Sequence, residues 1–232
     1  MKDNKKHKKA EYGILITGLI ILLAVACIIA LCAGQYSVSV PEVTKILASR
    51  FVNVTKTWSN TAEGVVFTLR LPRIIGAVLV GSALSLSGAA YQGVFKNPLV
   101  APDLLGVSSG ACVGASVAIL LHLNSFGVQA MAFVAGILAV GLTLFIPRLI
   151  KNTNMTMLVL SGIIVKGIMD SVMGIIKYVA DPETELQSIT YWQLGSLTKV
   201  LPKDLFTVGP VIVAASVIIF LLRWRINILS LG

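Results

Sequence analysis

Six long apolar segments constrain the fold of this chain more than any other feature. Each approaches the roughly 20 mostly apolar residues that a helix needs to cross a bilayer. They are residues 13–33, 74–93, 104–121, 128–147, 156–179 and 206–224, of which the third is the shortest. Backbone groups inside a bilayer must pair within their own segment, which favours helices over open strands. The sequence therefore predicts an all-α, polytopic membrane bundle with about six transmembrane helices in one domain.

The composition agrees with a membrane protein and argues against a nucleic-acid binder. Only 12% of the 232 residues are charged, whereas a soluble domain carries about 25%. The net charge is +9, but the basic residues lie between apolar runs instead of forming a patch with interleaved aromatics. The three cysteines show no CxxC spacing and the two histidines lie far apart. We therefore predict no metal site, no cofactor and no disulfide framework.

The N-terminus combines a basic tail, residues 1–12, with a first apolar run of 21 residues. That run is longer than the roughly 7–15 residues of a signal-peptide core, which favours an uncleaved transmembrane helix. With the tail in the cytoplasm, the inside segments hold ten Lys and Arg and the outside segments eight. This bias predicts that both termini are cytoplasmic. The long outside segments, 34–73 and 180–205, are expected to form short helices at the membrane surface, where a partner could bind.

Small residues are concentrated in the second and third apolar segments. In the third, Gly106, Gly110, Gly114 and Ala118 recur every four residues and are predicted to share one helix face. Small residues allow the backbones of neighbouring membrane helices to approach closely. Generic packing explains any one of these glycines, but together they indicate a compact bundle of several helices.

Two charged residues, Lys166 and Asp170, fall near the middle of the fifth apolar segment. Their spacing of four places them on the same face of a helix. Charged groups at bilayer depth cost several kcal/mol unless they are paired or face water. Two readings remain open: a local Lys–Asp pair that neutralises itself, or a face that lines a translocation pathway.

Four motifs occur in order along the chain from residue 69. They are LRLPR at 69–73, the run GSALSLSGAAYQGVFKNPLVAPDLLGVSSGACVG at 81–114, which holds two of them (SGxxxQxxxxNPL and PxxLGxxxGA), and YWQLGSL at 191–197. Together they resemble the permease subunits of ABC importers for iron complexes and cobalamin, the FecCD family. The motif positions that carry the resemblance and read as structural are Gln92, Asn97, Pro98, Pro102, Gly106, Gly110, Trp192 and Gly195.

The resemblance implies a permease in the cytoplasmic membrane of a prokaryote, with about ten helices in the family. It implies three kinds of partner: a second permease subunit (the same chain or a close paralogue), a dimer of cytoplasmic ATPase subunits, and an extracytoplasmic substrate-binding protein. The arginines of LRLPR match Arg70 and Arg73, which the resemblance implies dock on carboxylates of the binding protein, as arginine is well suited to do. The alternative is that both arginines snorkel from a helix end.

The resemblance also implies a cytoplasmic gate at Asn154, Met155 and Thr156. Lys166 departs from the small or apolar residue expected at its position, and an added cation suits an anionic cargo such as a ferric siderophore. No nucleotide-binding motif, GxxxxGK[ST], occurs in the chain, so the ATPase activity is expected on a separate subunit and the chain itself is not expected to be an enzyme.

The stretch SGAAYQGVFKNPLVAPDLLGVSSG, residues 87–110, is predicted to be a cytoplasmic hairpin between two helices. The first helix is expected to end near Gln92, because the residue before Pro98 is pushed out of helical geometry. Pro102 and Asp103 then suit the first turn of the next helix.

The chain is shorter than the family pattern, since it ends at RINILSLG without the coupling loop and later helices. A truncated product, a fragment or half of a split gene is therefore expected. Two other functions stay open: a secondary transporter or channel with Lys166–Asp170 as a proton-linked switch, and an inactive remnant that only inserts into the membrane.

Overall fold

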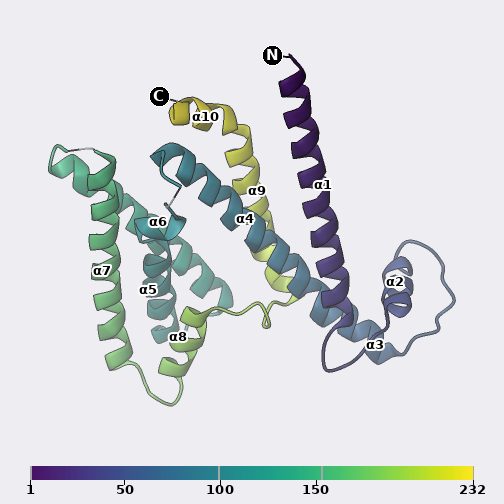
Figure 1. The fold of residues 1–232 in the computed structure, drawn as a ribbon. Helices are drawn as coiled ribbons and strands as arrows, with labels where there is room; N and C mark the ends of the chain where they lie inside the picture. The colour runs from purple at the N-terminus through teal and green to yellow at the C-terminus, as the bar shows by residue number, and fades with distance from the viewer. Residues whose placement is uncertain (1, 99, 153, 232) are drawn as a thin grey trace. The chain divides into compact units, whose positions relative to one another are not determined.

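The protein is helical throughout the part that the structure describes. In the computed structural model this part comprises residues 2–98, 100–152 and 154–231. The α-helices are α1 (Lys2–Cys32), α2 (Val40–Ala48), α3 (Asn60–Gly64), α4 (Leu71–Phe95), α5 (Val107–Leu120), α6 (Ser125–Leu149), α7 (Met155–Val179), α8 (Glu185–Leu194), α9 (Pro202–Leu221) and α10 (Arg223–Leu231) (Figure 1). A π-helical turn, Val65–Arg70, joins α3 to α4, and a 3-10 turn, Pro102–Leu105, precedes α5.

Five helical segments among the described residues are long and apolar enough to cross a membrane. They are Glu11–Cys32, Asn60–Phe95, Ser125–Leu149, Met155–Val179 and Pro202–Leu221. The prediction of an all-α, polytopic membrane protein is confirmed. The third predicted segment, 104–121, contains the shorter apolar helix α5 of 14 residues, which is about 21 Å long at 1.5 Å per residue.

The chain divides into two compact units. The first comprises Met1–Val80 and Leu197–Val211, and the second comprises Gly81–Ser196 and Ile212–Gly232. In the first unit, a small apolar core joins the end of α1 to the segment that follows it. Its buried residues are Leu31, Val38, Val43, Ile46, Trp58, Ala62 and Val66. Of the short helices predicted in segment 34–73, α2 is present as a separate helix, whereas α3 is the first part of the second spanning helix. Both contribute residues to this core.

The second spanning helix begins at Asn60, 14 residues before the predicted start at residue 74. Ser59 caps it, accepting a hydrogen bond from the backbone N–H of Ala62 at 3.0 Å. The helix then has to pass Pro72, which lacks an N–H and would clash with a carbonyl one turn earlier. The π turn that ends at Arg70 widens the helix immediately before this proline. Hydropathy alone missed the first part of the helix because it contains polar and charged residues.

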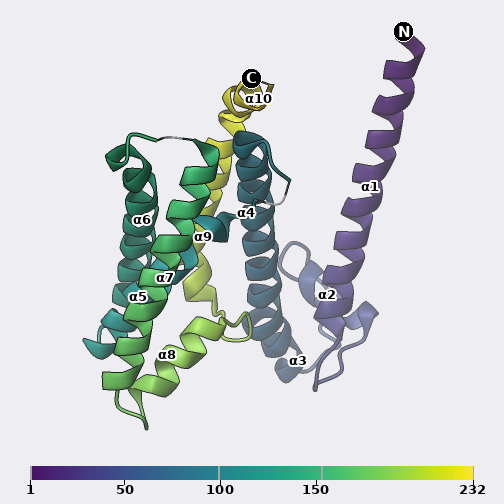
Figure 2. The same ribbon diagram turned by 60° about the vertical axis from the view of Figure 1, so that its left-hand side comes forward.

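In the second unit, α5 packs closely on α6, and α7 lies beside both (Figure 2). A Cβ on Gly110 would lie 2.5 Å from that of Ala139, and one on Gly114 would lie 2.5 Å from that of Ala135. The predicted close backbone approach is therefore present along this face. Gly106 does not share it: its φ of +73° ends the 3-10 turn before α5 begins, and it faces Val165 of α7 instead.

The hairpin between α4 and α5 differs from its prediction in where its first helix ends and in where its second half lies along α7. The helix continues past Gln92 to Phe95, where Lys96 adopts a left-handed conformation with φ +51°. The Asn97 N–H donates to the Gln92 carbonyl at 3.2 Å. The 3-10 turn that starts at Pro102 then packs against the middle of α7, at Gly162 and Lys166, and not beyond the end of that helix. Because α5 is too short to cross about 30 Å of hydrocarbon, this turn supplies part of the crossing.

The segment that follows α7 is an ordered turn into α8. The Asp181 carboxylate accepts hydrogen bonds from the Thr184 hydroxyl and from the backbone N–H groups of Thr184 and Glu183. These bonds, that of the Thr184 hydroxyl first, hold the pKa of Asp181 below its usual value. At the other end of α8, Gly195 adopts φ +71° and donates to the Trp192 carbonyl at 3.1 Å. The WxxG spacing of the motif is thus a helix end that favours glycine.

Candidate functional site

An ion pair lies midway along α7. The Lys166 ammonium group donates to the Asp103 carboxylate, with Nζ and Oδ2 2.8 Å apart. Lys166 is roughly 17 Å from the first residue of α7 at 1.5 Å per residue. One of the two readings that the sequence left open paired Lys166 with Asp170, one turn further along the same helix. The structure corrects this: Lys166 pairs with Asp103, and Asp170 forms no ion pair within the described residues.

Backbone contacts hold the turn that carries Asp103 against two helices. A Cβ on Gly162 of α7 would collide with the Leu104 carbonyl oxygen. The Thr143 hydroxyl of α6, which is fully buried, donates to the Leu105 carbonyl at 3.0 Å. These contacts satisfy a polar backbone group at bilayer depth, as a non-helical segment there requires. Asp103 therefore reaches Lys166 from a fixed position.

The ion pair is half-exposed, with side-chain exposures of 44% for Lys166 and 49% for Asp103. Asp170 is also exposed on this helix. Exposure of charged groups to lipid at this depth is costly, so such a face is covered by protein or by water. The three side chains together carry one net negative charge. An anionic cargo would thus have to compete with Asp103 for the Lys166 ammonium group.

Arg70 occupies a different environment from Arg73, the other arginine of the LRLPR motif. Only 9% of Arg70 is exposed, and its guanidinium donates to the carbonyls of Leu31 at 2.6 Å, Cys32 at 3.1 Å and Tyr36. It thereby satisfies carbonyls at the C-terminal end of α1, where a cation is favoured by the helix dipole. The contacts place Arg70 inside the protein, whereas the motif alone suggested a surface residue.

Gly34 is required beside Arg70. Its φ of +149° disfavours other residues, and a Cβ there would lie 2.6 Å from the Arg70 Nη2. Arg73 lines the same cavity of about 500 Å³ together with Arg70. Arg73 is partly exposed, and its buried Nε has no hydrogen-bond partner. Of the two motif arginines, Arg73 is therefore the more exposed.

The predicted gate residues Asn154, Met155 and Thr156 lie together at the first turn of α7 and are all exposed. Asn154 takes the N-cap position in extended geometry, without a side-chain capping bond. They lie on the same helix as Lys166, one to two turns from Ser161, which bonds back to the Met157 carbonyl. The structure brings neither the gate residues nor the motif glycine Gly195 into contact with the ion pair.

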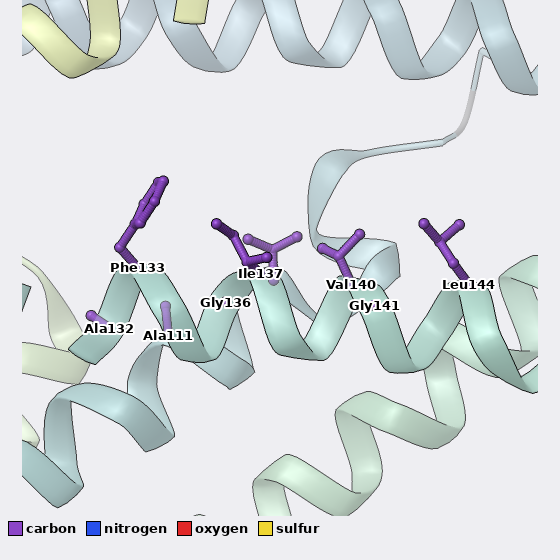
Figure 3. Close-up of a pocket in the computed structure, with 9 residues that line it drawn as sticks. Ala111, Ala132, Phe133, Gly136, Ile137, Val140, Gly141 and Leu144 are labelled. Carbon is purple, nitrogen blue, oxygen red and sulfur yellow. The ribbon is translucent and has the colours of Figure 1, made fainter. Parts of the chain in front are cut away.

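A groove of about 470 Å³ follows α6 and is lined only by apolar residues. Phe133, Ile137, Val140 and Leu144 point from the same side of the helix (Figure 3). Its lining offers no charged or hydrogen-bonding side chain, so it suits a lipid chain or another apolar helix and not a polar cargo.

The sequence did not predict three residues of the site, namely Asp103, Thr143 and Gly162. Asp103 and Lys166 are separated by 63 positions, so no local spacing could reveal the pair. Thr143 and Gly162 looked like ordinary helix residues. A weak signal for Asp103 was its place in an otherwise apolar segment, where an acidic residue requires a partner.

These features define the class of protein. It is an all-helical, polytopic membrane protein with an ion pair midway along a spanning helix and a non-helical turn at the same depth. Charged residues in such positions are typical of transport proteins.

The chain belongs to the FecCD transport family, which matches residues 22–232. The molybdate import system permease protein MolB of Haemophilus influenzae is 34% identical over 222 residues, which cover 95% of this chain and 65% of that protein. A probable iron chelatin transport system permease protein of Helicobacter pylori is 40% identical over 168 residues, which cover 72% of this chain and 50% of that protein.

A solved structure has the same fold. It is a metal-chelate type ABC transporter in an inward-facing conformation, with a TM-score of 0.79 and 31% sequence identity. The match covers 95% of this chain and 66% of that one. The chain thus spans half to two thirds of the length of these relatives.

Proposed function

We propose that this protein is a membrane-spanning permease subunit of an ATP-driven importer for an iron complex such as a ferric siderophore. Membership of the FecCD family carries this proposal. It is supported by relatives named for iron chelatin and for molybdate transport. The iron chelatin relative and the four sequence motifs favour an iron complex as the cargo.

The proposed pathway follows the face of α7 that carries Lys166 and Asp170. The observation in its favour is the half-exposed ion pair of Lys166 with Asp103 at mid-span. Contact of that charged face with lipid would be costly. Water or a second permease subunit, identical or closely related, would therefore cover it. In the transport cycle, Asn154, Met155 and Thr156 would form the gate at the cytoplasmic end of this helix.

The proposed partners are a pair of ATPase subunits on the cytoplasmic side and a substrate-binding protein on the outside, with the N-terminus in the cytoplasm. ATP hydrolysis would occur on the ATPase subunits. For docking of the binding protein we favour Arg73, which is partly exposed, over Arg70, which is buried and whose guanidinium already serves three carbonyls. Arg70 would then position the docking surface.

Affinity purification of the protein from its native membrane, followed by uptake assays in membrane vesicles, tests the function. We expect an ATPase subunit and a binding protein to co-purify, and uptake of a ferric chelate to stop when ATP is depleted. The proposal fails if no ATPase subunit co-purifies and uptake follows the proton gradient regardless of ATP.

That second outcome would favour a proton-linked secondary transporter. Asp170 is the observation on its side, because it is an exposed carboxylate at mid-span without an ion-pair partner among the described residues. Replacing Asp170 with Asn would then abolish uptake driven by the proton gradient, whereas an ATP-driven permease would keep its dependence on ATP.

A further inference from the structure

The turn after α2 exposes two large apolar side chains outside the candidate membrane spans. Phe51 is 91% exposed and Val52 is 63% exposed. The turn is ordered, because the N–H groups of both residues donate to the Ala48 carbonyl at 2.9 Å. The Ser49 hydroxyl adds a bond to the Ile46 carbonyl at 2.7 Å. These hydrogen bonds thus hold the two apolar side chains outward.

The helix before this turn is amphipathic. Val43 and Ile46 of α2 are buried in the small core with the end of α1. Thr44 and Lys45 lie on its exposed side. The protein core thus takes up the apolar face of α2, and Lys45 and the turn that follows the helix face outward.

The position of α2 relative to α1 sets its depth. Both belong to the first unit, and α2 lies beside the last turns of α1 in both views (Figures 1 and 2). The described side chains of α1 are almost all exposed and apolar, as expected for a helix in contact with lipid. Because Glu11–Cys32 is of membrane-spanning length, its last turns lie near the edge of the hydrocarbon. The turn at Phe51 is thus continuous with a lipid-facing surface.

The charges around the turn fit a phosphate-bearing surface. Arg50 is exposed, and its guanidinium lies 4.7 Å from the Phe67 ring centroid, which fixes it next to Phe51. Lys45 lies in the last turn of α2. Lys56 is engaged by Glu63 at 2.8 Å. Two basic groups therefore flank the exposed apolar pair, as in side chains that snorkel towards headgroups.

We propose that α2 and its turn form an interfacial membrane anchor. Phe51 and Val52 insert at the boundary between headgroups and acyl chains of the leaflet where α1 ends. Lys45 and Arg50 contact the phosphates of the same lipids. The anchor fixes the segment between α1 and α3, and with it the surface around Arg73, at a constant height above the bilayer.

Depth-dependent quenching tests the anchor. Cys27, Cys32 and Cys112 are replaced by Ala, and Phe51→Cys is labelled with an environment-sensitive fluorophore in nanodiscs of phosphatidylcholine and phosphatidylglycerol. Glu183→Cys, on the exposed turn before α8, is the matched control. We expect blue-shifted emission at position 51 and quenching by shallow spin-labelled lipids several-fold stronger than at position 183. An unchanged thermal unfolding midpoint verifies that the labelled protein is folded.

Two results would overturn the anchor. Emission and lipid quenching at position 51 equal to those at position 183 would place the turn in water. A label that lipid does not quench but that added binding protein shields would make this surface a protein-docking site. Neither result depends on whether the protein moves an iron complex, because the anchor requires only that α1 spans the bilayer.

Discussion

At the scale of single residues, the two arginines of LRLPR separate into two roles. Arg70 donates to three carbonyls at and after the end of α1, whereas the Nε of Arg73 is unpaired. Their spacing of three residues gave no indication of this difference. It arises because the first unit folds the end of α1 back onto the second spanning helix.

Replacing Arg70 with Met should destabilise the protein. The change leaves the carbonyls of Leu31, Cys32 and Tyr36 without their charged donor, which costs about 2–4 kcal/mol. Arg73→Met, the matched control, should cost less than about 1 kcal/mol. Thermal unfolding in detergent, followed by circular dichroism, measures both. Equal effects of the two variants would refute the structural role of Arg70.

Charge reversal at Arg73 should weaken docking of the binding protein. Arg73→Glu repels acidic groups of the partner, and the loss of affinity should be greatest at low ionic strength, where screening is weakest. Lys203→Glu, an exposed basic residue of the same unit, serves as the control. Surface plasmon resonance at two salt concentrations gives the comparison. Docking that is unaffected by Arg73→Glu would remove this residue from the interface.

The Lys166–Asp103 pair should show energetic coupling. Lys166→Met and Asp103→Asn each leave one charge uncompensated. The losses of stability in the two single variants should therefore add up to more than the loss in the double variant. A double-mutant cycle should give a coupling of about 1 kcal/mol. Unfolding midpoints of the four proteins in detergent supply the cycle. Strictly additive effects would mean that the ion pair contributes nothing to the fold.

At the scale of elements, the turn from Pro102 to Leu105 packs the hairpin between α4 and α5 against α7. Its position depends on Gly162, which allows the Leu104 carbonyl to approach the helix. Gly167, on the same helix, has open space where a Cβ would be. A comparison of the two glycines therefore distinguishes the effect of close packing from the low helix propensity of glycine.

Gly162→Ala should therefore be destabilising, whereas Gly167→Ala should not. The methyl group at position 162 forces the turn away from α7, which costs about 1–3 kcal/mol. At position 167, the better helix propensity of alanine should give no loss or a small gain. Thermal unfolding of the protein in detergent compares them. A tolerated Gly162→Ala would contradict the packing of this turn against α7.

The elements also show where sequence patterns sufficed and where they did not. Apolar length identified the spanning helices, because the bilayer imposes a fixed minimum. It missed the start of the second one at Asn60, since polar residues and a π turn precede Pro72 there. It also treated residues 104–121 as one helix, although Gly106 separates a 3-10 turn from α5. Local turn geometry depends on contacts with α6 and α7 that hydropathy does not contain.

At the scale of the whole molecule, the family follows from ordered motifs more than from composition. LRLPR, the hairpin motif and WxxGSL indicate the FecCD permeases, and the family match over residues 22–232 confirms this. The sequence also indicated Lys166 as a residue of interest. It could not supply Asp103 as the partner, because that contact exists only after α5, α6 and α7 have packed.

The central claim is that the Lys166 face of α7 lines a water-accessible pathway, and thiol accessibility in membrane vesicles tests it most directly. With the native cysteines replaced by Ala, Asp170→Cys and the α6 control Ile137→Cys are treated with a membrane-impermeant thiol reagent. We predict modification of position 170, slowed by the transported chelate, and no modification of position 137, which lies on an apolar groove. A position 170 as unreactive as position 137 would contradict the pathway.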